Sequence, residues 1–208
     1  MSPAGWTDFL ERHFGRWSFP HLARGLVAMN AASWLLNLAS PGFLAILRME
    51  PALVLQGEFW RVITFIFVPP SSTHPIFFFL FLWFLWSIGE ALEETLGSFH
   101  LNLYFLVSMA AVVAVSFLQP AVPVNSFYLF NSLFLGFAIT LPDQKIFFFP
   151  IPIPLPVTWV AGTTSALLLV QVFFGPALLP GLLAGHAGFL TFFGPGLYDA
   201  LLARFRRD

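Results

Sequence analysis

Long apolar runs dominate the sequence, and short groups of polar residues and helix breakers separate them. Three intervals contain no Asp, Glu, Lys or Arg: 28 residues between Arg61 and Glu90, 48 between Glu94 and Asp143, and 53 between Lys145 and Asp199. A helix that crosses a membrane needs about 20 apolar residues. Each of the last two intervals is therefore long enough for two crossings.

This pattern predicts an all-α membrane bundle of six crossing helices. The predicted crossings are residues 21–40, 75–93, 99–118, 125–141, 156–175 and 179–197. Short segments with helix breakers, such as QPAVP and PDQK, separate them. Residues 41–73 include the apolar run RVITFIFVPP but hold too many charges and breakers for a simple crossing. We expect them to form a long interfacial or partly re-entrant loop whose backbone is shielded by protein.

Both ends of the chain, and one proline-rich segment, need separate interpretations. Residues 1–19 mix aromatic and charged side chains, which predicts an amphipathic helix on the membrane surface rather than a cleaved signal. Residues 20–197 form one membrane domain, and 198–208 form a short basic tail. The PIPIPLP run at 150–156 fixes φ at every second residue, so we expect an extended linker at the membrane edge. A proline-rich ligand is the alternative, although no basic residue flanks it.

Composition supports an integral, multi-pass membrane protein that contacts lipids. Hydrophobic residues make up 58% of the chain and charged residues 9%, whereas soluble proteins have about 45–50% and 25%. The net charge of −1 argues against nucleic acid as a partner. The chain has no cysteine, which excludes disulfides, thiol nucleophiles and thiolate metal sites. No metal or cofactor is predicted, and the type of membrane is not indicated.

Positive charges favour cytoplasmic locations for both termini, an arrangement that an even number of crossings permits. Only Arg48 and Arg61 would then lie on the outer side. Seven residues would lie on the cytoplasmic side: Arg12, Arg16, Arg24, Lys145, Arg204, Arg206 and Arg207.

Four segments resemble, in order and spacing, the membrane core of the rhomboid superfamily. They are GEFWRVITFIFVP, LWFLWSIGEALEETLGSFHLNLYFLVS, LPDQKIFFFPIPIP and AGHAG. They are similar to the family's tryptophan-arginine pair in the first loop, its acidic turn after helix two, its proline-acid turn after helix four and its histidine beside glycines in helix six. The resemblance covers about residues 20–197. It implies a rhomboid-like six-helix bundle in which Trp60 and Arg61 belong to the functional loop.

Active rhomboids are intramembrane serine proteases, and the resemblance implies where their catalytic parts would fall. His186 matches the helix-six histidine. Either Ser126 or Ser132 lies near the helix-four serine, but neither is in a Gly-x-Ser-Gly motif. The helix-two positions that support the oxyanion in the family fall on about Phe77 and Phe81, whose rings cannot donate hydrogen bonds.

Each candidate also has a structural interpretation. Ser126 or Ser132 can bond back to its own helix. His186 can be neutral and bonded to Asn125, Asn131 or Ser132. Trp60 and Arg61 can be an interfacial aromatic and a cation tied to backbone carbonyls or to Glu58. Small residues that allow close packing of helices four and six are Ser132, Gly136, Gly181, Gly185 and Gly188.

Two functions from different classes follow. The first is a non-proteolytic, derlin-like pseudoprotease that binds transmembrane segments of client proteins and assists their turnover or transport. The alternative is a divergent intramembrane serine protease that uses His186 with Ser126 or Ser132. A small transporter is disfavoured because the interiors of the predicted crossings lack Asp, Glu, Lys and Arg for binding an ion.

Overall fold

The computed structural model is mostly helical and describes residues 5–69, 74–120, 126–147 and 154–205. An N-terminal helix α1 (Gly5–Phe14) and turn η1 (Gly15–Trp17) precede the bundle. The bundle helices are α2 (Leu22–Ala39), α6 (Pro75–Leu96), α7 (Ser98–Leu118), α8 (Phe127–Thr140), α9 (Val157–Phe174), α10 (Leu179–Gly185) and α11 (Ala187–Phe205). The first loop contains α3 (Phe43–Leu47), α4 (Pro51–Leu55), α5 (Arg61–Thr64) and η2 (Phe65–Phe67), and η3 (Pro176–Leu178) precedes α10.

Within the described ranges, α6, α7 and α9 are long and apolar enough to cross a membrane. A fourth candidate span is the bent pair Pro176–Gly185 and Ala187–Asp199, while α8 is apolar but shorter. α2 has the extent predicted for the first crossing but is not among these helices, since Arg24, Asn30 and Asn37 lower its hydropathy. The helices are those of a multi-pass integral membrane protein, and the number six stays a prediction.

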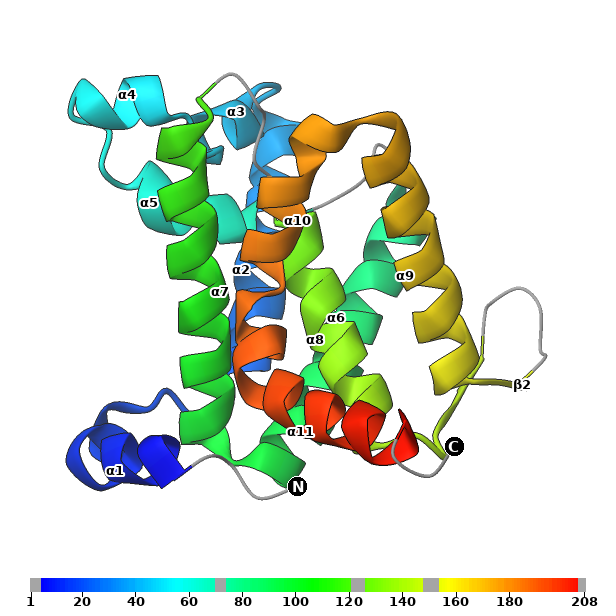
Figure 1. Cartoon of the computed structure of the whole chain (residues 1–208). Coiled ribbons are helices and arrows are strands. Elements are labelled where there is room, and N and C mark those ends of the chain that lie inside the picture. The colour runs from blue at the N-terminus through cyan, green and yellow to red at the C-terminus, as the bar shows by residue number, and fades with distance from the viewer. Residues whose placement is uncertain (1–4, 70–73, 121–125, 148–153, 206–208) are drawn as a thin grey trace.

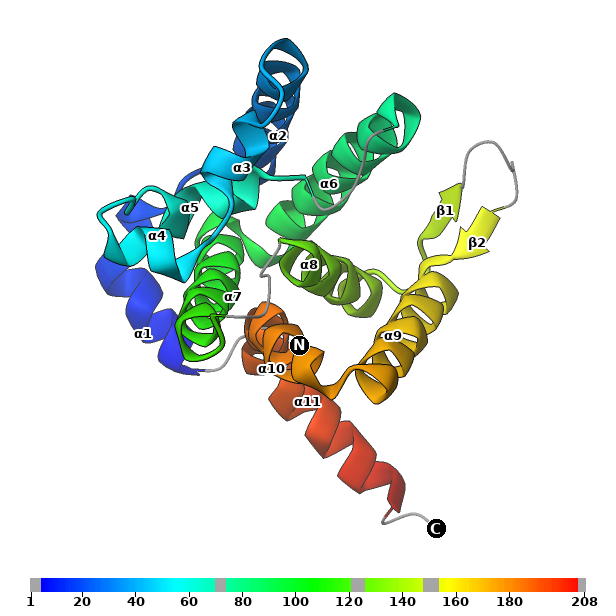
Figure 2. The same cartoon turned by 90° about the horizontal axis from the view of Figure 1, so that it is seen from above.

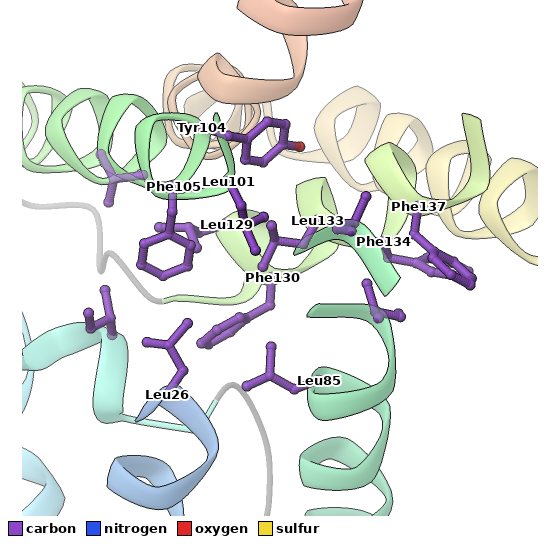
Figure 3. Packing of buried hydrophobic residues seen from close by; sticks show 14 of the residues in the cluster. Leu26, Leu85, Leu101, Tyr104, Phe105, Leu129, Phe130, Leu133, Phe134 and Phe137 are labelled. Carbon is purple, nitrogen blue, oxygen red and sulfur yellow. The ribbon is translucent and has the colours of Figure 1, made fainter. Parts of the chain in front are cut away.

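α8 occupies the centre of the bundle. Seen from above, α6, α7, α9 and α10 surround it (Figure 2), and each of them contacts it. Its side chains point in several directions toward these neighbours (Figure 3), and Leu129, Phe130, Leu133, Phe134 and Phe137 are all buried. Such a helix is apolar on every side because protein or lipid, and not water, surrounds it.

The segment predicted as the sixth crossing is a bent pair of helices rather than one straight helix. The two helices together are long and apolar enough for a span, and the crossing itself stays a prediction. The chain breaks at His186, whose φ of −95° and ψ of 9° are not helical, and the two halves are bent by 79°. Gly185 and Gly188 flank the break, and glycine costs about 1 kcal/mol relative to alanine in a helix interior. α11 then continues past the predicted end at 197, to Phe205.

The segment around the prolines adds a small sheet to an otherwise helical chain. Strand β1 (Lys145–Phe147) pairs antiparallel with β2 (Pro154–Pro156), with Ile146 opposite Leu155. The predicted extended conformation is therefore present at 154–156, and residues 150–153 lie outside the described ranges. Prolines on β2 lack amide hydrogens, which restricts this pairing to a short ribbon at the edge of the molecule.

α1 and the far end of α11 lie at one end of the bundle, while α3 and α4 lie at the other (Figure 1). The first loop is thus a folded cap of short helices rather than a simple connection. Residues 70–73 of the predicted loop lie outside the described ranges.

Candidate functional site

His186 lies at the break between α10 and α11 and is 8% exposed. Its Nδ1 is 2.8 Å from the carbonyl oxygen of Leu182, one turn earlier in α10. Its Nε2 is 3.2 Å from the side-chain amide of Asn131 on α8. The Leu182 carbonyl also accepts the backbone amide of His186 at 3.1 Å, so the ring adds a second hydrogen bond at the end of α10 and links the broken helix to α8.

The contact with Leu182 indicates which nitrogen of the imidazole ring carries a hydrogen. The Leu182 carbonyl can only accept, so Nδ1 carries a hydrogen. Oδ1 of Asn131 is the amide atom that faces Nε2. In a neutral ring Nε2 would be an acceptor, and a hydrogen bond would then require the amide to be turned so that Nδ2 donates to Nε2. Both ring nitrogens thus lie within hydrogen-bond distance of protein groups. Of Asn131 and Ser132, the two candidates that the structure describes, Asn131 is the one that contacts His186.

Ser132 lies on α8, one residue beyond Asn131, and is fully buried. Its hydroxyl donates to the carbonyl of Leu129 at 2.9 Å, which is the backbone-bonded state considered from the sequence. Tyr104 of α7 donates to the Ser132 carbonyl at 2.6 Å. The single hydroxyl hydrogen of Ser132 is therefore directed at its own helix and not at a base.

Ser126 has a different role at the start of α8. Its hydroxyl donates to the carbonyl of Val68 at 2.7 Å, across 58 residues of sequence, and the residue is fully buried. It therefore fastens the end of the first loop to the central helix. Within the described part of the chain, neither Ser126 nor Ser132 hydrogen bonds to His186, and Asn125 lies outside that part.

The two phenylalanines at the expected oxyanion positions face different surroundings. Phe77 is 63% exposed on the outer face of α6. Phe81 packs edge-on against Phe130 of α8, with ring centroids 5.3 Å apart. Phe81 thus fills the interface between the second and fourth predicted crossings with apolar surface, where the family resemblance would call for a polar donor.

Glycines allow the broken helix to approach its neighbours closely. A Cβ atom on Gly185 would lie 2.4 Å from the Cβ of Tyr128, and one on Gly181 would lie 3.8 Å from the Tyr128 ring, so both face α8 as predicted. Gly136 faces Phe193 of α11. Gly188 instead faces α7, where a Cβ would lie 2.3 Å from the Tyr104 carbonyl oxygen.

The contact predicted for Gly188 with helix four is therefore wrong. The 79° bend turns α11 toward α7, and the Gly188 amide donates to the Ser108 hydroxyl of α7 at 2.8 Å. This bond satisfies one of the amides that the start of a helix leaves free.

Arg61 and Trp60 form the second candidate region, in the first loop. Arg61 is 5% exposed and has both kinds of partner expected for a cation at that depth: Nε donates to Glu58 at 2.6 Å, and Nη1 donates to two backbone carbonyls. Arg61, Trp60 and Thr64 together supply donors to four consecutive carbonyls at the end of α3. The acceptors are Ala45 and Arg48 for Arg61, Ile46 for Trp60 and Leu47 for Thr64.

Sequence reasoning missed two residues that hold the inner end of this loop. Asn30 of α2 donates to the carbonyl of Ile66 at 3.2 Å, and Ser33 donates to the carbonyl of Phe67. With Ser126 on the carbonyl of Val68, three successive carbonyls at the end of η2 and directly after it have side-chain donors. The available signal was the presence of Asn and Ser in an apolar run, since polar groups in a membrane helix need partners.

No family model, curated protein or solved structure matches the chain. The rhomboid resemblance therefore rests on the four sequence segments alone. No group of three or more His, Asp or Glu in the described ranges could hold a metal ion. The hydrogen bonds around His186 join helices to one another. They do not place a described serine hydroxyl in contact with a free base.

Proposed function

We propose that the chain is a non-proteolytic, rhomboid-like membrane protein with six crossings that binds transmembrane segments of client proteins. One observation carries the proposal: the candidate base and both candidate nucleophiles have other hydrogen-bond partners. A serine becomes a useful nucleophile only when its hydroxyl donates to a base. Here Ser126 and Ser132 donate to backbone carbonyls, and His186 is engaged by Leu182 and Asn131.

The chemistry of the expected oxyanion positions supports the same proposal. Loss of one preorganised donor costs roughly 3–4 kcal/mol of transition-state stabilisation in serine proteases. Phe77 and Phe81 offer no donor, and Phe81 is packed against α8.

Exposed aromatic residues on α6 suit the binding of a client helix. Phe77, Phe79 and Trp83 are 53–63% exposed, and van der Waals packing is a main source of helix association in lipid. Orientation is part of the proposal: the positive charges favour cytoplasmic termini, and the position of α1 and the far end of α11 at one end of the bundle is compatible with this (Figure 1).

A serine-directed fluorophosphonate probe tests the absence of proteolytic chemistry. We expect the protein in liposomes to be labelled no more than its Ser126→Ala, Ser132→Ala and His186→Ala variants. Labelling that is lost with one serine and with His186 would favour the alternative, a divergent intramembrane serine protease, and would identify its nucleophile.

Client binding needs a separate test with a defined single-span membrane protein in the same liposomes. A photocrosslinking residue at exposed Phe77 should join the client in an uncut state. The matched position is Phe78, which is 1% exposed and should give little product. Equal crosslinking from both positions, or a cleaved client, would contradict the proposal.

A further inference from the structure

The segment formed by α1, η1 and Phe19 exposes an unusual amount of aromatic surface. Phe9 is 61% exposed, Phe14 55%, Trp17 72% and Phe19 73%. Two arginines, Arg12 and Arg16, are interleaved with these residues and are also exposed. We call this set of six residues the N-terminal patch. Aromatic side chains beside cations are typical of surfaces that sit in the headgroup region of a bilayer.

The arginines of the patch differ from two other arginines of the structure. Arg24 pairs with Glu90, and Arg61 pairs with Glu58, whereas Arg12 and Arg16 have no carboxylate partner in the described ranges. The nearby Glu11 has a 49% exposed side chain, and its Oε2 is 4.0 Å from Nε2 of His100 on α7. α1 also carries Asp8 and Glu11, but neither arginine forms an ion pair within the part of the chain that the structure describes, so both guanidinium groups are available to an anion outside the chain.

The patch is held in a defined place on the bundle. Phe19 and Asn102 of α7 exchange two hydrogen bonds, of 3.3 and 2.9 Å, through the Phe19 backbone. Thr7 of α1 is 1% exposed. α1 lies across the end of the bundle beside the start of α7 (Figure 1). The exposed side chains are thus fixed at one end of the bundle, beside the start of α7.

We propose that the N-terminal patch binds the headgroups of anionic phospholipids. Arg12 and Arg16 would contact phosphate groups, for which the guanidinium has a matching planar array of donors. The aromatic rings would lie at the boundary between headgroups and acyl chains. An acidic protein fits the patch less well than lipid does. The four exposed aromatic residues belong to a membrane protein, so lipid is the apolar partner that lies beside them. The proposal is independent of whether the chain cleaves clients.

The absence of cysteine in the chain permits a single reporter. His13 is exposed between the two arginines, so His13→Cys can carry an environment-sensitive fluorophore on the full chain in lipid nanodiscs. Emission is measured in phosphatidylcholine discs with an increasing mole fraction of phosphatidylglycerol. We expect a shift to shorter wavelength that saturates as phosphatidylglycerol increases and that 1 M salt reverses.

Variants then assign the effect to the patch. Each juxtamembrane basic residue strengthens attraction to an anionic surface by about fivefold, so Arg12→Ala should raise the half-saturating mole fraction by about that factor. The double change of Arg12 and Arg16 to alanine should abolish the response, and the double change to lysine should retain most of it. The control is Lys145→Ala, which removes an exposed positive charge on β1 and should leave the response unchanged.

Three outcomes would overturn the proposal. One is the same emission in both lipids, and another is an equal loss of response in Lys145→Ala. The third is a full emission shift in pure phosphatidylcholine discs after a soluble anion is added. A shift with glycerophosphate would indicate a site for free phosphate, and a shift with polyglutamate would indicate an acidic protein partner.

Discussion

Replacement of Gly185 by alanine tests whether the close contact between α10 and α8 holds the break at His186 in place. The added Cβ would lie 2.4 Å from the Cβ of Tyr128, 2.9 Å from its carbonyl carbon and 3.1 Å from the amide nitrogen of Leu129. Two of these three atoms belong to the backbone of α8, so rotation of a side chain cannot relieve the overlap. α10 would have to move away from α8.

The size of the effect follows from the geometry. Ordinary contacts of a Cβ atom begin at 3.4 Å, so the helices would separate by about 1 Å at this point, and overpacking of this kind costs about 1–3 kcal/mol. Gly162 of α9 provides a matched control, because a Cβ there meets nothing within 4 Å. Gly162→Ala should gain up to about 1 kcal/mol from helix propensity. The two variants should therefore differ by about 2–4 kcal/mol in the free energy of unfolding.

Unfolding in mixed micelles, with SDS as the denaturant, measures this difference. A double-mutant cycle adds a second criterion, since separation of the helices should also weaken the contact between Asn131 and His186. Asn131→Ala should therefore destabilise the Gly185→Ala protein by less than it destabilises the original protein. Equal stability of Gly185→Ala and Gly162→Ala, or strictly additive effects of Asn131→Ala, would refute the reasoning.

Three further changes test other parts of the fold. Arg61→Ala should lower the free energy of unfolding by about 3–5 kcal/mol, because it leaves a carboxylate and two carbonyls without their donor. Arg61→Lys should be more stable than Arg61→Ala but less stable than the original protein. Equal stability of Arg61→Lys and Arg61→Ala would contradict this expectation for the guanidinium group. His21→Gly should stabilise the protein by about 0.5 kcal/mol, since His21 has a φ of +58° that disfavours residues with a Cβ; a loss of stability would show that the His21 side chain outweighs this strain. Ser33→Ala should lower the free energy of unfolding by about 1–3 kcal/mol, because it leaves the Phe67 carbonyl unpaired. The control Ser87→Ala removes an exposed hydroxyl and should change stability by less than about 0.5 kcal/mol. Equal losses in the two variants would argue against a role for the bond from Ser33 to Phe67.

The extents of most long helices could be predicted from sequence because apolar length and breakers are local properties. The predicted crossings at 75–93 and 99–118 correspond to α6 and α7 within a few residues, and Gly97, with a φ of +83°, marks the boundary between them. Glycine adopts this conformation without steric cost. The predicted segments at 125–141 and 156–175 likewise contain α8 and α9.

The direction of α11 could not be predicted in the same way. An apolar run such as LLAGHAGFLTFF has the same hydropathy whether it is straight or bent. The bend depends on groups far away in sequence, namely Tyr128 against Gly185 and Tyr104 with Ser108 against Gly188. The assignment of Gly188 to the wrong neighbour follows from the same cause.

The partners of the candidate serines were also beyond local sequence. Ser126 and Ser132 have the same residue types around them, each following an asparagine, yet one donates to a carbonyl 58 residues away and the other to its own helix. Their difference comes from the first loop, whose end brings the carbonyl of Val68 to the start of α8. Resemblance to a catalytic motif therefore left the choice between the two serines open.

The hydrogen bonds of Ser126 connect stability to the question of activity. An irregular segment inside a membrane protein needs donors for its carbonyls, because an unpaired backbone group in lipid costs several kcal/mol. Asn30, Ser33 and Ser126 supply these donors to residues 66–68. For Ser126 to serve as a nucleophile, its only hydrogen would have to turn from Val68 to a base, and the carbonyl would lose its partner. Catalysis through Ser126 would therefore require release of the first loop from α8, whereas binding a client on the outer face of α6 would leave that attachment intact.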